Sequence, residues 1–450
     1  MMPAQPHIEA CPAPIVRVVH VEDGRYENPD HKTVENLPVL TIVYLELKPA
    51  ERSRIRVEVA LPEPAAWNGR LVGCGNGGGA GGLPSQNICN FAKGGYAAVT
   101  TDMGTAPNPL LAGIGNPEVW KDFGHRATHL MTVVAKELVR AQYGRDPDYA
   151  YFIGGSTGGQ QALSLAQRHP EDYDGILAAV PAHCRTPLHA YFLWNYQCVH
   201  RADGTRLFTK EQEASYRKTA LEYISRRETF PHGRDRFIAD PRWTEEDRAA
   251  ILALAAERDP SLTPEHIEAL RRLQNGPVHA RTGKRIFEPI PPATAFDPAI
   301  GNLYLFHWVF GKDANLLTLD FDKDYDRYYA ALSPDLDAED ENLDAFRARG
   351  GKLLMYSGTA DSCVPYTATL AYYQRVADRI GSLDETQDFF LFYLLPGREH
   401  GGGPGVQFIE DDFGLLRAWR EKGVRPQATG RAMVPPTFTI PLKPYPQYFE

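Results

Sequence analysis

Short hydrophobic runs and longer amphipathic segments alternate along the first 180 residues of the chain. The runs are rich in β-branched and aromatic residues and end in glycine or polar turns, which predicts buried strands, whereas the segment at 124–143 predicts a helix. Such alternation is typical of the α/β class, in which helices cover both faces of a mostly parallel sheet. The predicted strands are "LTIVYLEL" at 40–47 and "RIRVEVALP" at 54–62, expected to pair antiparallel, then "RLVGCGN" at 70–76, "YAAVTTD" at 96–102 and "YAYFIGG" at 149–155.

The pattern changes after "DGILAAVPA", which ends at Ala182. Aromatic and charged segments follow, and two of them predict helices that begin at Thr244 and Thr263. In both, a threonine precedes an acidic residue, a combination typical of helix N-caps. Strand-like runs return only at 351–358 and 389–397.

This change in the pattern of residues predicts two unequal domains. We expect a sheet domain made of residues 1–182 and 345–450, and a lid domain at residues 183–344 inserted into it. The acidic run "DLDAEDENLDAF", at 335–346 near the second junction, is predicted to be solvated.

Composition narrows the range of partners. The 450 residues carry a formal net charge of −9 and a sequence pI of about 5.9, whereas affinity for a phosphate backbone comes largely from Lys and Arg. Neither nucleic acid nor a membrane is therefore expected as a partner, and no stretch approaches the roughly 20 apolar residues of a membrane span. No secretory signal is visible, so we expect a cytoplasmic protein, or a secreted one if a leader has been removed. The sequence does not fix an oligomeric state.

The six cysteines show neither a CxxC motif nor Cys/His spacing, so a structural zinc site is not expected. An even number permits disulfides. Sparse cysteines in a chain of this length are more often free and buried, and that is the interpretation we favour.

The most informative motif is "GGSTG", residues 154–158, which fits Gly-x-Ser-x-Gly between a predicted strand and a predicted helix. In that context the serine is a candidate nucleophile, because a tight strand-to-helix turn lifts its hydroxyl clear of the sheet. The N-terminus of the following helix would favour a developing oxyanion. The alternative is a glycine-rich turn in which Ser156 only caps the helix.

A nucleophilic serine needs a base and an acid, which follow it in the order Ser, acid, His in hydrolases of this kind. Asp361 follows the predicted strand at 351–358, and His400 follows the next strand. Because open α/β sheets build their sites at the carboxyl ends of strands, these two residues are the candidate acid and base. Each could instead be an ordinary loop residue, and Asp337 and Glu399 remain alternative acids.

Acyl transfer also needs hydrogen-bond donors for the oxyanion. The backbone N–H of Thr157, directly after the candidate nucleophile, is one expected donor. The other is expected from "GCGNGGGAGG", residues 73–82, where Gly77 and Gly78 are favoured. A flexible glycine turn is the alternative, and a phosphate loop is disfavoured because Gly-Lys-Ser/Thr is missing.

The chain resembles the tannase and feruloyl esterase family, which also contains mono(hydroxyethyl) terephthalate hydrolases. The resemblance implies an α/β-hydrolase fold with a large lid, and a serine carboxylic ester hydrolase with Ser156, Asp361 and His400 as its triad. The expected partner is a small-molecule ester of an aromatic acid of the hydroxycinnamic, hydroxybenzoic or terephthalic type. The matching motifs are "GNGGGAGG", "TTDMG", "DFGHRATH", "YFIGGSTGGQQALSLAQRHPEDYDGILAAVPA", "FRARGGKLLMYSGTADSCVPYTATLAYYQRV", "PGREHGGGPG" and "PLKPYPQ".

The chain departs from the family pattern at several positions. Family members have cysteines before the serine and after the histidine that form a disulfide, whereas Gly155 and Gly401 stand here. The loss of both cysteines suits a reducing compartment. Without the disulfide we expect a working but more mobile site. Gln160 stands where arginine is usual.

No cofactor or catalytic metal is expected. The lid of the family often carries an aspartate-rich calcium loop. The corresponding stretch here, "TFPHGRDRFIADPRW", keeps Asp235 and Asp240 but loses most of the acidic spacing that calcium requires, so calcium is not expected in the lid either.

Four lid aromatics are candidate walls for a planar acyl group: Phe192, Trp194, Trp308 and Phe310. The alternative for each is packing inside the protein. Two other functions stay open at the level of sequence. One is a serine amidase or peptidase on the same fold, and the other is a catalytically inactive small-molecule binding protein.

Overall fold

The structure is a computed structural model that describes residues 14–226, 238, 241–296, 301, 303–433, 437 and 439–447. The chain forms two compact units. The first contains Met1–His183 and Asp335–Leu354, and the second contains Cys184–Pro334 and Met355–Glu450. The predicted division into a sheet domain and a lid stays a prediction.

The first unit is built on a mixed sheet whose strands lie in the order β1-β4-β5-β7-β6-β8-β9. The strands from β1 to β7 in this order pair antiparallel, and β7, β6, β8 and β9 pair parallel. The predicted pair at 40–47 and 54–62 is confirmed, with Leu40 opposite Pro62. The strands are β1 Ile15–Val21, β4 Leu40–Leu47, β5 Ile55–Pro62, β6 Arg70–Cys74, β7 Ala97–Thr101, β8 Tyr149–Gly155 and β9 Gly175–Ala179.

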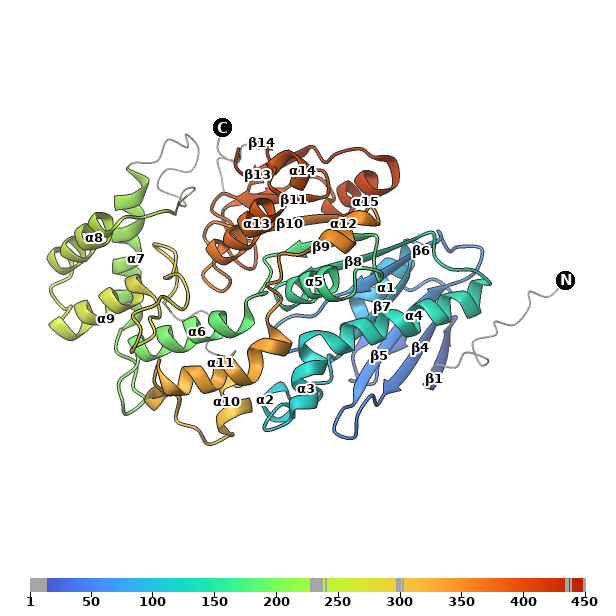
Figure 1. The fold of residues 1–450 in the computed structure, drawn as a ribbon, viewed down its shortest axis with the longest axis horizontal. Coiled ribbons are helices and arrows are strands. Elements are labelled where there is room, and N and C mark those ends of the chain that lie inside the picture. Colours follow the sequence, from blue (N-terminus) through green and yellow to red (C-terminus); the bar gives the residue numbers. More distant parts are fainter. Residues whose placement is uncertain are drawn as a thin grey trace. The chain divides into compact units, whose positions relative to one another are not determined.

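Helices cover both faces of this sheet. Every residue of β5 and β7 is therefore buried. Helix α1 packs on β5, β6 and β7, while α4 and α5 contact each other and also pack on the sheet (Figure 1). A single π-turn, η2, precedes α4, so the helix predicted at 124–143 is confirmed with an irregular first turn. The remaining elements are β2 Tyr26–Glu27, β3 Thr33–Val34, α1 Ser85–Lys93, α2 Pro109–Ala112, α3 Pro117–Lys121, η2 Asp122–Arg126, α4 Ala127–Tyr143, α5 Thr157–Arg168 and α12 Asp344–Ala348.

A buried ion pair ties β5 to the end of β7. Arg56 donates from Nε to Asp102 Oδ2 at 2.8 Å, and its backbone N–H donates to Asp102 Oδ1 at 3.0 Å. The Arg56 side chain is 9% exposed and that of Asp102 only 1%. Burial raises the pKa of Asp102, and the Arg56 guanidinium opposes that rise. Asp102 belongs to the "TTDMG" motif, so this motif has a structural role.

Replacing Arg56 by methionine should destabilise the first unit by about 3–5 kcal/mol, because a buried carboxylate then loses its countercharge. The midpoint of urea unfolding, followed by tryptophan fluorescence, measures this loss. Arg54→Met is the matched control, since Arg54 pairs with Glu46 from a side chain that is 58% exposed. Its effect should stay within about 1 kcal/mol. Equal midpoints for the two variants would contradict the structural role of the buried pair.

The second unit combines helices with β11 and a small antiparallel sheet of β12, β13 and β14. Strand β10, Lys352–Gly358, begins in the first unit and continues into the second. The N-caps predicted at Thr244 and Thr263 are confirmed as capping boxes, although the partner of Thr263 is His266 rather than an acidic residue. The elements are α6 Arg185–Val199, α7 Lys210–Ser225, α8 Glu245–Arg258, α9 Pro264–Asn275, α10 Tyr304–Phe310, η4 Leu316–Thr318, α11 Lys323–Leu336, α13 Tyr366–Ile380, α14 Leu383–Gln387, β11 Phe390–Leu395, β12 Val406–Phe408, α15 Asp412–Lys422, β13 Ala428–Ala432 and β14 Thr439–Leu442.

The acidic run at 335–346 is not simply solvated, so that prediction was wrong in part. Leu336, Ala338 and Leu343 are buried, because every few residues the run turns an apolar side chain inward. Its backbone carbonyls also accept hydrogen bonds from α5: Gln160 Nε2 donates to the carbonyl of Leu336 at 3.0 Å. Because the apolar residues of this run are scattered among acidic ones, their burial is not apparent from the sequence.

None of the helices in the described residues combines the length and hydrophobicity needed to span a bilayer.

Candidate active site

Ser156 lies in the first unit, between the end of β8 and the start of α5. Its backbone has φ 58° and ψ −116°, a conformation that side-chain-bearing residues rarely adopt and that costs free energy unless the surroundings hold it. Two backbone hydrogen bonds do so: the N–H of Ser156 donates to the carbonyl of Ala179 at 3.0 Å, and the N–H of Ala182 donates to the carbonyl of Ser156 at 3.0 Å. The strained turn that the Gly-x-Ser-x-Gly pattern predicts is therefore present.

The turn is tight because its glycines let backbone segments touch. A Cβ at Gly154 would lie 2.2 Å from the carbonyl oxygen of Gly158, and a Cβ at Gly75 would lie 2.7 Å from the Cα of Gly158. No side chain fits at those distances. The glycines before and after the serine therefore bring β6, β8 and α5 together around Ser156.

Gly154→Ala should reduce ester hydrolysis by about 100-fold or more and lower the melting temperature, because the turn must open to accept the new Cβ. The neighbouring Gly155→Ala is the matched control: its Cβ would meet Ala179 Cβ at 3.6 Å, an ordinary contact. Hydrolysis rates and thermal unfolding curves of the two variants measure the difference. If Gly155→Ala were the more damaging change, the role of the tight turn would be refuted.

The glycine loop after β6 lies beside this turn in the first unit. The N–H of Gly158 donates to the carbonyl of Asn76 at 2.7 Å, and the hydroxyl of Thr157 donates to the carbonyl of Gly78 at 2.6 Å. A Cβ at Gly77 or Gly78 would meet nothing within 4 Å, so both residues face open space. The structure thus brings the predicted donor Thr157 and the two candidates for the second donor, Gly77 and Gly78, into one loop cluster.

Two amide side chains that the sequence did not single out hold this loop. Gln161 Oε1 accepts from the backbone N–H of Asn76 at 2.8 Å, and Asn76 Nδ2 donates to the carbonyl of Thr101 at 2.7 Å. Both side chains are buried. The loop also borders a hollow of about 740 Å³ that reaches Gly155. An open loop rim held by buried amides can present backbone N–H groups to a ligand.

Asp361 and His400 meet in the second unit. His400 Nδ1 lies 2.8 Å from Asp361 Oδ2, and since an ionised carboxylate only accepts, the Nδ1–H donates. Asp361 is fully buried, and its Oδ1 accepts from the backbone N–H groups of Cys363 at 2.9 Å and Val364 at 2.8 Å. The carboxylate is thus fixed, and it fixes the tautomer in which Nε2 of His400 can accept a proton.

The structure also distinguishes Asp361 from one alternative acid, Glu399. The Glu399 side chain turns toward Gly403, where an added Cβ would lie 2.9 Å from its carboxylate. The other alternative, Asp337, belongs to the first unit and stays a prediction. His400, whose side chain is 31% exposed, keeps Asp361 as its carboxylate partner.

A pocket of about 430 Å³ opens beside His400 within the second unit. Its volume is in the range usual for small-molecule sites. Its wall is mainly aliphatic and small, with Arg217 and Glu399 as its charged members. Sequence reasoning missed this pocket, because its wall comes from five separate stretches of the chain. The lining residues are Arg217, Leu221, Ile238, Pro241, Pro292, Ala293, Thr294, Ala295, Thr359, Ala360, Ser362, Cys363, Gly397, Glu399, His400, Gly401 and Pro404.

The four predicted aromatic walls do not line this pocket. Trp194 donates from Nε1 to the carbonyl of Arg272 at 2.9 Å, and its ring packs edge-on against Phe321. Phe192 and Trp308 are buried, and Phe310 lies under the guanidinium of Arg327. These contacts indicate that the four aromatic side chains pack against other residues of the protein. That any of them touches substrate stays a prediction.

The five cysteines in the described part of the chain are free, as expected: Cys74, Cys89, Cys184, Cys198 and Cys363. Burial raises the pKa of the Cys363 thiol to about 12, so it is not a ready nucleophile beside His400. A Cβ at Gly401 would meet nothing within 4 Å. Gly401 contributes no side chain to the histidine loop, and Gln407 Nε2 anchors the loop by donating to the carbonyl of Gly402 at 2.8 Å.

The predicted calcium stretch cannot be compared with the structure, because Asp235 and Asp240 lie outside the described residues. The expectation of no lid calcium therefore stays a prediction.

Comparisons with known proteins show which family the chain belongs to. A sequence model of the family "Tannase and feruloyl esterase" matches residues 41–303 and 296–448. An uncharacterized esterase of Xanthomonas campestris pv. campestris is 29% identical, over 90% of this chain and 80% of the relative. Feruloyl esterase B of Aspergillus niger is 27% identical, over 86% of this chain and 78% of the relative.

Solved structures show the same fold. Feruloyl esterase B from Aspergillus oryzae has a TM-score of 0.83 at 22% identity, covering 96% of this chain and 92% of that one. Tannin acyl hydrolase from Aspergillus niger has a TM-score of 0.76 at 18% identity, covering 98% and 91%. The predicted α/β-hydrolase fold is confirmed. The chain belongs to the tannase and feruloyl esterase family and is a carboxylic ester hydrolase.

Proposed function

We propose that the chain cleaves esters of aromatic acids through an acyl-enzyme on Ser156. His400 is the general base and then the general acid, and Asp361 orients it. The strained backbone of Ser156 at the end of β8 carries the proposal, because a glycine-lined turn held at φ 58° between a strand and a helix is the geometry that presents a nucleophilic hydroxyl.

In the first half of the reaction, Ser156 Oγ attacks the ester carbonyl carbon while His400 Nε2 takes the hydroxyl proton. The carbonyl oxygen becomes an oxyanion, which the N–H groups of Thr157 and of Gly77 or Gly78 stabilise. As the C–O bond breaks, His400 returns the proton to the leaving alcohol, and the acyl group stays on Ser156. Water then repeats the sequence and releases the acid.

Asp361 supports both halves without itself taking the proton. Its Oδ2 holds the Nδ1–H of His400 and stabilises the imidazolium that forms during attack. Because Oδ1 is occupied by two backbone N–H groups, the carboxylate has no freedom to rotate away.

The substrate class is supported by the relatives and by the pocket beside His400. Named feruloyl esterases are among the relatives, and the pocket wall of prolines and alanines suits a flat, apolar group. We propose that this pocket receives one side of an aromatic ester.

Ala295→Trp should reduce kcat/KM for methyl ferulate by roughly 10-fold or more, because the indole would fill the pocket that holds the larger substrate. Hydrolysis of p-nitrophenyl acetate, which needs little of that space, should persist within a few-fold. Parallel kinetics on the two substrates with wild type and variant measure the ratio. An equal loss on both substrates, or none, would refute the role of this pocket.

Initial rates on methyl ferulate, methyl gallate, a mono-hydroxyethyl terephthalate and p-nitrophenyl acetate, each with wild type and Ser156→Ala, test the proposal. Hydrolysis of at least one aromatic ester that disappears in the variant supports it. A matched amide of the preferred acid tests the amidase alternative: comparable rates on amide and ester would favour that alternative.

A further inference from the structure

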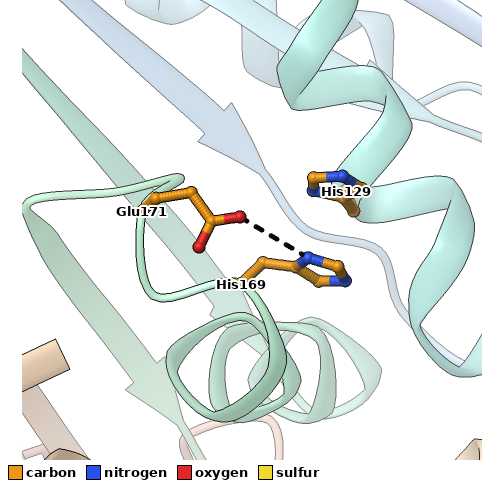
Figure 2. A group of neighbouring side chains, drawn as sticks. All are labelled: His129, His169 and Glu171. Atoms are coloured by element: carbon orange, nitrogen blue, oxygen red, sulfur yellow. Dashed lines mark ion pairs between the residues drawn. The ribbon is translucent and has the colours of Figure 1, made fainter. Parts of the chain in front are cut away.

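Two histidines and a glutamate form a separate cluster in the first unit. His129 lies on α4, His169 caps the C-terminus of α5, and Glu171 follows in the turn before β9. One ring nitrogen from each histidine and one carboxylate oxygen all lie within 4.8 Å of one another. Figure 2 shows the two imidazole rings facing each other with the Glu171 carboxylate at their side.

The cluster is geometrically ordered. The two rings stack with centroids 3.7 Å apart and planes 10° from parallel. His169 Nδ1 lies 3.8 Å from Glu171 Oε1, too far for a hydrogen bond, and that carboxylate has no closer partner among the described residues. The backbone N–H of Asp172 donates to the carbonyl of His169 at 3.0 Å, which fixes the turn that carries Glu171.

Asp172 prepares His129 to act as a ligand. Its Oδ2 lies 2.8 Å from His129 Nδ1, and its side chain is 4% exposed. The carboxylate therefore keeps the proton on Nδ1 and leaves the Nε2 lone pair available. Metal-binding histidines are held in the same way by a carboxylate on the other ring nitrogen. His129 Nε2 has no hydrogen-bond partner in the described part of the chain, so nothing there competes for that lone pair.

We propose that His129, His169 and Glu171 form a binding site for Zn²⁺ or a similar borderline divalent cation, with water completing the coordination. Two imidazoles and a carboxylate suit zinc, whereas magnesium and calcium prefer oxygen ligands alone. Tetrahedral zinc needs ligand atoms about 3.3 Å apart, given Zn–N bonds of about 2.0–2.1 Å. Because parallel stacked rings direct their lone pairs in parallel, binding requires the His169 ring to turn out of its stack with His129, and the exposed Glu171 side chain to turn toward the ion.

A second cluster of possible metal ligands differs from this one, because an arginine pairs with its carboxylates. His279, Asp322 and Asp326 also come together, but Arg281 donates to Asp322 at 2.9 Å and to Asp326 at 2.7 Å. The arginine occupies the carboxylates and neutralises them. We therefore expect no zinc there, which makes this cluster the internal control.

A bound ion would link α4 to the C-terminal end of α5. Helix α5 has 12 residues, so its far end lies about 18 Å along the axis from Ser156, at 1.5 Å per residue. The bound ion would thus hold α4 and the C-terminal end of α5 together, and it would not touch the reacting atoms.

Titration calorimetry with ZnCl₂ at pH 7.5 tests the site on full-length protein, alongside thermal unfolding with and without zinc. Wild type and His279→Ala should each bind one equivalent and melt at a higher temperature with zinc. His129→Ala and His169→Ala should weaken binding at least about 10-fold and lose the zinc-induced shift, and Asp172→Asn should weaken it about 10–100-fold. Circular dichroism checks that each variant is folded. If His169→Ala does not fold, His169→Gln takes its place.

Three results would overturn the proposal. They are the absence of zinc binding to wild type at millimolar concentration, unchanged affinity in the folded His129 and His169 variants, and loss of binding only in His279→Ala. Magnesium in place of zinc should give no shift in the melting temperature, and a shift equal to that of zinc would also count against the site.

Discussion

Replacing Ser156 by alanine should lower kcat for ester hydrolysis by about 10⁶-fold, because no other group in the proposed mechanism can form the acyl intermediate. The folded structure should survive, since the side chain only loses its hydroxyl. The residual rate would reflect the oxyanion donors and substrate binding alone. Steady-state kinetics on methyl ferulate, with circular dichroism to confirm folding, measure the effect.

Ser362→Ala is the matched control for this prediction. Ser362 lines the pocket beside His400 and is the residue next to Asp361, so it tests whether a serine near the base can act as the nucleophile. Its kcat should stay within a few-fold of wild type. If Ser362→Ala lost activity and Ser156→Ala kept it, the nucleophile would have been misassigned.

Asp361→Asn should lower kcat by about 10⁴-fold with little change in KM. The amide can still accept the N–H groups of Cys363 and Val364 through its oxygen, which turns its NH₂ group toward His400. His400 Nδ1 must then accept a hydrogen bond rather than donate one. The proton consequently moves to Nε2, where the base needs a lone pair.

Glu399→Gln separates this effect from a general loss of negative charge. Glu399 adjoins His400 in sequence and lines the same pocket, but its carboxylate turns toward Gly403. Its kcat should change no more than a few-fold. Similar losses in the two variants would show that Asp361 acts through the field of the pocket rather than through the tautomer of His400.

Much of the fold was predictable because its signals are local. The strands at 40–47 and 149–155 have a continuous apolar pattern, and the structure places β4 and β8 at the same residues. Strand β1 was missed because, as an edge strand, it buries only Val21 fully and leaves its other residues exposed or half-buried. The acidic run was misjudged because its four buried apolar residues, Leu336, Ala338, Leu343 and Phe346, are sparse among charges.

Only those residues of the candidate site that lie in short sequence motifs could be predicted. Glycines around Ser156 and strand ends before Asp361 and His400 are visible in the sequence. The pocket beside His400 was not predictable, because Arg217, Ala295 and Thr359 come from distant parts of the chain. The same holds for His129 and His169, whose proximity depends on helix packing.

The central claim is that acyl transfer passes through Ser156. A reaction with the p-nitrophenyl ester of ferulic acid, quenched in acid within milliseconds and digested for peptide mass spectrometry, tests it most directly. The account predicts a burst of p-nitrophenol equal to the enzyme present, and a feruloyl mass on Ser156 in the "GGSTG" peptide. A feruloyl mass on Ser362 or Cys363 instead, or steady hydrolysis with no adduct and no burst under conditions that make deacylation rate-limiting, would contradict it.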